Sequence, residues 1–187
     1  MRIFRRLIRK IHQIRYQRAL PGERAKIIRG MKNFVRIGDH CEIYGGVSFG
    51  SEPYMIELGD HVRVTANVHF LTHDGGLWVF RTQKALEHAD LFGRIKVGNN
   101  VHIGMGAYIC PNVTIGDNVI VAVGAIVTKD VPSDCVVAGI PAKIIETIDE
   151  YYQKHKDAYD YTKHLTPEEK RHYLYRKYAA SSSESPL

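Results

Sequence analysis

The chain has 187 residues, of which 44% are hydrophobic and 25% charged, and its 26 Lys and Arg exceed its 20 Asp and Glu. This composition is typical of a folded globular protein and excludes a disordered or fibrous chain. The length favours one core domain with appendages. The longest apolar run, Val119–Val127, is far too short for a transmembrane helix. Cys41, Cys110 and Cys135 lack the spacing of zinc ligands, so we expect no metal and a reducing, cytoplasmic setting.

The first segment, residues 1–33, is strongly basic. Residues 1–29 contain ten Lys or Arg and a single acid, which gives this stretch a charge of +9. Its apolar residues recur at three- and four-residue steps, which predicts an amphipathic helix over residues 2–18 that ends before Pro21. We expect this helical cap to pack on the body or on a neighbouring subunit. Contact with an anionic membrane is the alternative, whereas nucleic acid is disfavoured because the rest of the chain is slightly acidic.

In the middle of the chain, an aliphatic residue falls on every sixth position. The clearest run is Val97, Ile103, Ile109, Ile115, Val121 and Val127, and a second apolar track follows each by four residues. Both tracks recur between residues 37 and 70. Neither a helix nor an ordinary strand has this period, which is typical of a parallel β-helix built from triangular coils of three hexads. We therefore predict an all-β core over residues 34–146, with about four to five stacked coils.

Gly-Asp and Gly-Asn pairs follow several of the aliphatic positions. They are Gly38-Asp39, Gly59-Asp60, Gly98-Asn99 and Gly116-Asp117. Such residues tolerate the turn and left-handed conformations that we expect at the corners of each coil. The hexad register breaks twice, near residues 51–57 and over residues 74–94, and we interpret the second break as a long excursion loop.

Beyond the last coil, residues 147–187 lose the hexad pattern. One helix is predicted over about residues 145–157. A second is predicted over about residues 166–178, because Thr166-Pro167-Glu168-Glu169 has the form of a capping box with proline at the first helical position. The Ser-rich residues 181–186 should be disordered.

Four motifs in the C-terminal half of the repeat region carry a family resemblance. They are Gly98-Asn99-Asn100-Val101, Pro111–Asn118, Val127-Thr128-Lys129-Asp130-Val131-Pro132 and Ala138–Lys143. Residues 35–147 resemble the hexapeptide-repeat O-acetyltransferases, which include galactoside, maltose, serine and polysaccharide acetyltransferases. The resemblance implies a left-handed parallel β-helix, acetyl-CoA as donor and a homotrimer with its sites between subunits. Residues 50–81 look closest to enzymes that acetylate sugars in surface-polysaccharide assembly.

Acetyl transfer from a thioester to an alcohol needs a base, and histidine suits this task. His73 stands where the regular coil gives way to the excursion, and it matches the family histidine that precedes a long loop. The resemblance implies that His73 removes the proton of a sugar hydroxyl as the oxygen attacks the thioester directly, without an acyl-enzyme. His69 and His102 each precede an inward position, so they should point outwards and could line a groove, while His88 is expected to be a solvated loop residue.

Donor and acceptor contacts are assigned in two sets. By resemblance, Met105, Val123, Thr128 and Lys129 contact acetyl-CoA, Lys143 meets its phosphates, and Gly124 gives a smooth turn for the pantetheine arm. For the acceptor, the candidates are Ser48, Glu52, Tyr54, Asp74 and Trp78. Glu52 or Asp74 would orient the imidazole or bind a sugar hydroxyl, and Trp78 would stack on a sugar ring.

Three other functions are alternatives to O-acetylation of a sugar or polysaccharide precursor. A γ-class carbonic anhydrase needs an HxxxxH pair of zinc ligands, and the residue five after His102 is Ala107. An N-acyltransferase acting on an amino-sugar nucleotide would use the same base. A non-catalytic β-helix scaffold would use the coils only as a binding surface.

Overall fold

The computed structural model describes residues 16–179. It divides into two compact units, the first ending at Tyr151 and the second beginning at Tyr152. Most of the predicted N-terminal helix over residues 2–18 lies outside the described residues; its last three residues, 16–18, are described and are helical. The predicted disordered tail also lies outside the described residues. Within the described residues, every helix is too short or too polar to span a bilayer.

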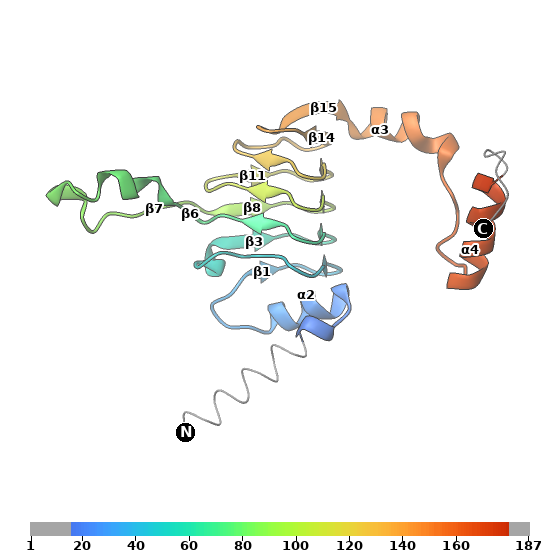
Figure 1. The fold of residues 1–187 in the computed structure, drawn as a ribbon, viewed down its shortest axis with the longest axis horizontal. Coiled ribbons are helices and arrows are strands. Elements are labelled where there is room, and N and C mark those ends of the chain that lie inside the picture. The colour runs from blue at the N-terminus through green and yellow to red at the C-terminus, as the bar shows by residue number, and fades with distance from the viewer. Residues whose placement is uncertain (1–15, 180–187) are drawn as a thin grey trace, which may run out of the picture. The chain divides into compact units, whose positions relative to one another are not determined.

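Three parallel sheets form the three faces of a β-helix in the first unit (Figure 1). Face A contains β1 (Arg36–Ile37), β3 (Ile56–Leu58), β8 (Ile95–Val97) and β11 (Thr114–Ile115). Face B contains β2 (Glu42–Ile43), β4 (Arg63–Val64), β9 (His102–Ile103), β12 (Ile120–Val121), β14 (Cys135–Ala138) and the antiparallel β15 (Lys143–Thr147). Face C contains β5 (His69–Phe70), β10 (Tyr108–Ile109) and β13 (Ile126–Val127). The predicted hexapeptide β-helix is therefore confirmed.

The hexad positions form the core. Every residue of the clearest aliphatic run, and every residue of the track that follows it by four, is buried. Strand partners in the upper coils are 18 residues apart, as in Thr114 beside Lys96 and Ile120 beside His102. Each coil thus hydrogen-bonds to the next through all three faces, and the apolar residues stack in columns inside.

The longer interruption is an arm that leaves the stack between face C and face A. The partner of His69 is Tyr108, so the register offset rises from 18 to 39 residues at this point. The arm pairs β6 (His73–Asp74) with β7 (Leu91–Phe92) in antiparallel fashion and carries the 3-10 helices η2 (Gly75–Phe80) and η3 (Lys84–Leu86). The shorter interruption contains η1 (Pro53–Met55). Arg81 holds the two sides of the arm together by contacting Asp90 at 2.8 Å and the carbonyl of Glu87 at 3.0 Å.

The Gly-Asp and Gly-Asn pairs lie at the corners, as predicted, but the left-handed conformation falls on the residue after each pair. Gly38, Gly59, Gly98 and Gly116 do not have a positive φ; the residues two positions later do, namely His40, His61, Asn100 and Asn118. Glycine is required instead by close approach of the next coil. A Cβ on Gly59 would lie 2.6 Å from both the Asn99 side chain and the Gly98 carbonyl. Asp60, Asn99 and Asp117, which follow three of these glycines, each accept a hydrogen bond from a backbone amide of the preceding coil, as Asn99 does from the Asp60 amide at 2.9 Å.

The two ends of the stack are covered differently. At the first coil, α2 (Pro21–Arg29) packs on β1 and β2 and buries Ala25 and Ile28. At the last coil, β15 turns back antiparallel on β14. The predicted helix from about residue 145 therefore begins later, as α3 (Ile148–His155), because the segment up to Thr147 completes strand pairing first.

The second unit contains η4 (Lys156–Ala158) and α4 (Pro167–Ala179). The predicted capping box is present, since Glu169 accepts from the Thr166 amide at 2.8 Å and the Glu169 amide donates back to the Thr166 hydroxyl at 3.3 Å. Asp160 anchors the helix by accepting from Lys177 at 2.6 Å and from Tyr173 at 2.7 Å. These hydrogen bonds, with Lys177 contributing most, lower the pKa of the Asp160 carboxyl.

Candidate functional site

His73 is held by a carboxylate at the base of the arm. Its Nδ1 atom lies 3.1 Å from Oε2 of Glu52, and the Ser51 hydroxyl lies 3.4 Å from the same nitrogen. The Thr72 hydroxyl donates to that Glu52 oxygen at 2.8 Å. Thr72 is fully buried, whereas the His73 side chain is 48% exposed and that of Glu52 only 17%. A buried hydroxyl thus fixes a mostly covered carboxylate, which in turn faces an accessible imidazole.

The environment keeps Glu52 ionised. The hydrogen bond from Thr72 contributes most to lowering the pKa of the Glu52 carboxyl, and Ser51 and His73 lower it further. A carboxylate beside Nδ1 favours the tautomer with hydrogen on Nδ1, so Nε2 keeps its lone pair. The edge of the Phe92 ring lies beside the imidazole, with the ring centroids 6.3 Å apart. The arrangement is that of an oriented general base whose free nitrogen can accept a proton.

The cysteines are poor nucleophiles. Burial raises the pKa of the Cys41, Cys110 and Cys135 thiols, and the nearby Asp74 carboxylate raises that of Cys110 further. A thiolate, not a thiol, is the reactive species. The only cysteine near the arm is therefore not set up to form an acyl-enzyme.

A second group of predicted residues lies on the edge where face B turns into face C, called here the B/C edge. Gly106 and Gly124 both have φ of +68° there, and a Cβ on either would meet open space. The Gly124 amide donates to the Met105 carbonyl at 2.8 Å, which stacks the two corners. The side chains of Met105 and Val123 are exposed on this edge, that of Val123 by 73%. Lys143 begins β15 after the chain has turned at the same edge, where the Ala142 amide bonds to Ile126.

Thr128 and Lys129 lie on a different edge. They follow β13, where face C turns into face A, and this C/A edge is also the one from which the arm and His73 emerge. Face C separates them from Val123 and Gly124. A single chain therefore does not bring all the predicted donor residues together, and it does not bring His73 to the turn at Gly124.

The acceptor candidates are similarly sorted by the structure. Glu52, not Asp74, contacts the imidazole; the Asp74 side chain accepts from the Gly76 amide at 2.7 Å and caps η2. Trp78 and Tyr54 are both exposed. Ser48 pairs with His69 on face C.

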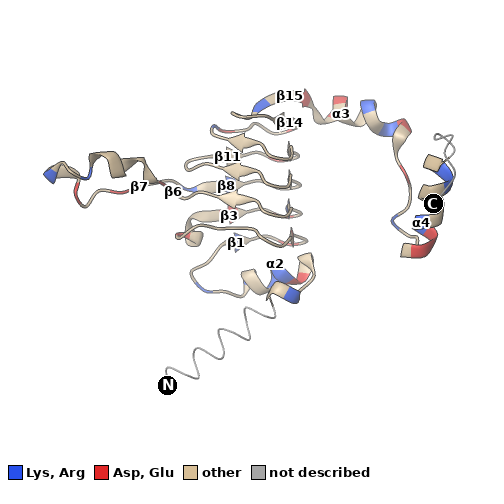
Figure 2. Cartoon of the chain, viewed as in Figure 1, with Lys and Arg blue, Asp and Glu red and all other residues tan. Residues whose placement is uncertain are grey.

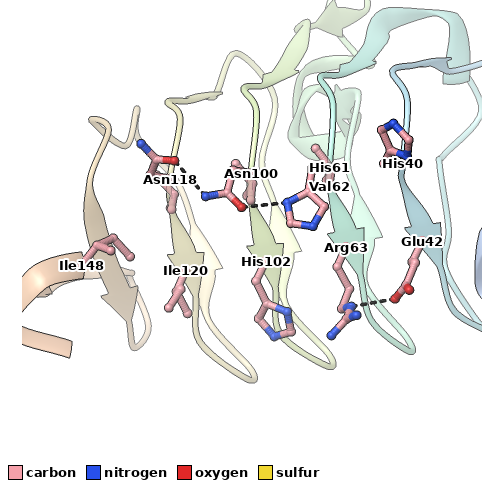
Figure 3. Close-up of a pocket in the computed structure, with 12 residues that line it drawn as sticks. His40, Glu42, His61, Val62, Arg63, Asn100, His102, Asn118, Ile120 and Ile148 are labelled. Carbon is pink, nitrogen blue, oxygen red and sulfur yellow. Dashed lines mark hydrogen bonds and ion pairs between the residues drawn. The ribbon is translucent and has the colours of Figure 1, made fainter. Parts of the chain in front are cut away.

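The three other candidate histidines have different surroundings from His73. The His69 ring stacks on Tyr108 on face C, with centroids 4.7 Å apart. His102 lines a groove of about 380 Å³ on face B, near Arg63 and Ile120 (Figure 3). Burial, assisted by Arg63, lowers the pKa of His102. His88 is exposed in the arm. Within residues 16–179, no group of three or more potential ligands could hold a metal ion.

Three residues of the site are absent from the sequence-based assignment. Ser51 contacts the imidazole, Thr72 fixes Glu52, and Phe92 lies against the imidazole although it is 19 residues away in the sequence. Thr72 is a polar residue within an otherwise apolar inward region, which is the one signal that could have identified it.

Comparison with known proteins places this geometry in a family. The family described as bacterial transferase hexapeptide (six repeats) matches residues 94–129. CapG of Staphylococcus aureus is 47% identical over 146 residues, which cover 77% of this chain and 84% of CapG. Galactoside O-acetyltransferase of Escherichia coli strain K12 is 33% identical over 117 residues, 55% of this chain and 51% of that protein.

A solved structure has the same fold. It is the hexapeptide-repeat-containing acetyltransferase of Vibrio cholerae O1 biovar eltor complexed with acetyl coenzyme A, and it aligns with a TM-score of 0.54 and 26% identity over 74% of this chain and 84% of that chain. The fold is a β-helix, its repeats match the hexapeptide family, and CapG is 47% identical over most of its length. The chain therefore belongs to the hexapeptide-repeat acetyltransferases.

Proposed function

We propose that this protein transfers an acetyl group from acetyl-CoA to a hydroxyl of a sugar or glycan, with His73 as general base. The observation that carries the proposal is the contact between Nδ1 of His73 and the ionised Glu52 carboxylate, which leaves the lone pair of Nε2 available on a side chain that is about half exposed. An acetyl-CoA complex of the related Vibrio cholerae acetyltransferase supports the choice of donor.

In the proposed reaction, Nε2 of His73 accepts the proton of the acceptor hydroxyl as its oxygen bonds to the thioester carbonyl carbon. The C–S bond then breaks, and the departing sulfur takes the proton from the imidazolium. The products are the O-acetyl ester and the free thiol of CoA. The raised pKa of Cys110 supports this direct route over one through a thioester on the enzyme.

The donor is assigned to the B/C edge. The exposed backbone around Gly106 and Gly124 offers a smooth surface for a pantetheine arm, and Lys143 at the same edge suits the phosphates of the nucleotide. Thr128 and Lys129 would contact the donor from the C/A edge of a second chain. The site is then shared between two copies, which supports a homotrimer in which three seams each combine one C/A edge with one B/C edge.

The acceptor is assigned to the arm. The exposed Trp78 ring can stack on the apolar face of a sugar, and the Asp74 carboxylate at the base of the arm can accept a hydrogen bond from a sugar hydroxyl. Ser48 on face C is a further candidate contact. Galactoside O-acetyltransferase, which is 33% identical, supports a sugar as the acceptor class.

The direct test is release of free thiol from acetyl-CoA in the presence of a panel of acceptors. The panel contains galactosides, nucleotide sugars, amino-sugar nucleotides and a lipid-linked glycan. We expect thiol release with a hydroxyl acceptor and a product whose acetyl group is removed by hydroxylamine, as esters are. A product carrying only a hydroxylamine-stable amide would replace this proposal with N-acylation, and release that is unaffected by His73→Ala would remove the assigned base.

A further inference from the structure

The end of the β-helix covered by α2 carries exposed cations and exposed apolar side chains together. Arg18, Lys26 and Lys32 are exposed, and none of them is paired with an acidic side chain of residues 16–179. Leu20 is 69% exposed and Met31 38%. We call these five residues, which lie on α2 or within three residues of its ends, the cap surface. Figure 2 shows Lys and Arg positions in blue along α2.

Other cations in the same region have structural partners. Arg24 donates to the carbonyls of Tyr16, Gln17 and Ile43, and Arg29 contacts Asp39 at 2.5 Å and the Ile37 carbonyl at 3.2 Å. These contacts tie α2 to the first coil. The three cations of the cap surface make no comparable contact with described residues, so their charge is available to an external partner.

The partner must be anionic. A cavity of about 710 Å³ opens between Arg18, Lys26 and Met31, and Glu23 is the only acid on its lining. Residues 1–15 cannot neutralise this surface, since they add six Lys or Arg and no acid.

Exposed apolar side chains among the cations distinguish the kind of anion. Phosphate backbones of nucleic acids bind cations and polar groups, and they offer nothing to Leu20 or Met31. A lipid leaflet offers both anionic headgroups and an apolar interior, and interfacial helices combine basic and apolar residues for this reason. We infer that the cap surface docks on membranes that contain acidic phospholipids. This inference goes beyond acetyl transfer and does not depend on it.

The test is sedimentation of the full chain with vesicles of neutral phosphatidylcholine and with vesicles containing about 30% phosphatidylglycerol. We expect binding to the acidic vesicles only. Binding should weaken as the salt concentration is raised above about 0.1 M, where the Debye screening length falls below about 10 Å. Each Lys or Arg near such a surface contributes roughly fivefold, so Lys26→Gln with Lys32→Gln should weaken binding about 25-fold. Lys163→Gln with Lys170→Gln makes the same charge change on the second unit and should have a much smaller effect.

Leu20→Ser separates docking from folding. Leu20 is the N-cap of α2 and its side chain makes no capping hydrogen bond, so serine should preserve or raise thermal stability. Vesicle binding should nevertheless weaken several-fold, because an exposed apolar side chain is lost. The inference would be overturned if the protein bound neutral and acidic vesicles equally, or if the two double variants lost the same amount of vesicle binding. It would also be overturned if the protein bound a short DNA duplex but not acidic vesicles.

Discussion

The hydroxyl of Thr72 lies 2.8 Å from the Glu52 carboxylate oxygen that also faces the imidazole of His73. Thr72 lies two residues after the end of β5 and is fully buried, so the packed part of the coil sets the position of the carboxylate. His73, the next residue, begins the arm. The proposed base thus stands on the junction between a packed scaffold and a loop that can vary with the acceptor.

His73→Ala should lower kcat by about 10²- to 10⁴-fold, the usual contribution of a general base. Its ring is about half exposed and belongs to no buried cluster, so the thermal midpoint and the oligomeric state should not change. The measurement is thiol release at saturating acetyl-CoA, with light scattering for the assembly. His88→Ala, which changes an exposed histidine of the arm, is the matched control and should retain near-normal kcat. Equal losses in the two variants would mean that the arm as a whole, not the imidazole, is responsible.

Glu52→Gln should reduce kcat by about 10- to 100-fold with little change in KM for acetyl-CoA, since it removes the charge that orients the imidazole. The pKa of the Glu52 carboxyl is lowered from the usual value for glutamate, about 4.3. The carboxylate is therefore ionised at any pH above about 4.3 and loses its charge only at more acidic pH. Above about pH 5 the acid limb of kcat/KM in the unmodified enzyme should therefore show a single ionisation.

Glu57→Gln provides the comparison for Glu52→Gln. Glu57 lies on β3, where its carboxylate faces Arg36 at 3.5 Å, and it is away from the arm. The Glu57→Gln substitution should leave kcat and the pH profile of kcat/KM unchanged. A second ionisation between pH 5 and 7 in the unmodified enzyme would show that Glu52 titrates during turnover, contrary to the hydrogen bonding seen here.

The periodic part of the molecule could be predicted from the sequence because each hexad repeats the same packing. Burial of every sixth residue and the two register breaks follow from this period. Pairing along the chain was harder to predict: β15 returns antiparallel on β14, which no period signals, so the start of α3 was placed too early. The candidate donor residues could be listed from the sequence. The edge of the β-helix on which each one lies depends on how many corners the chain has turned before it, and Thr128 therefore lies on a different edge from Val123.

Gly59→Ala should destabilise the β-helix by about 1–3 kcal/mol, the cost of forcing extra volume into packed structure. The added Cβ would lie 2.6 Å from the backbone carbonyl of Gly98, which cannot move without disturbing the ladder. Gly45→Ala is the control, because its φ is not positive and a Cβ there meets nothing within 4 Å. Urea unfolding monitored by circular dichroism measures both. Similar midpoints for the two variants would contradict the close-approach explanation for the Gly-Asp and Gly-Asn pairs.

Asn118 supports a ladder of polar side chains along one corner. It accepts from Asn100 at 2.8 Å and donates to Asp134 at 2.8 Å, with φ of +54°. Asn118→Ala should cost about 2–4 kcal/mol, from two lost hydrogen bonds and a left-handed conformation that alanine disfavours. Asn118→Gly loses the same hydrogen bonds without the conformational cost, so it should be about 1 kcal/mol less destabilised. If Gly is no better than Ala, the left-handed corner contributes nothing to the stability of this fold.

Sharing of the site between chains can be tested by mixing two inactive variants. His73→Ala removes the base on the C/A edge, and Val123→Trp places a large ring on the B/C edge, where Val123 is exposed and its replacement disturbs no core residue. Each variant alone should be inactive. Coexpressed in equal amounts and purified through two different tags, they should recover roughly a third of normal activity, because each mixed trimer has one seam of its three that combines an intact base with an intact donor edge. A site formed within one chain could never be restored in this way, since every chain carries one of the two changes. Activity at background level in mixed trimers of confirmed composition would therefore exclude the shared site.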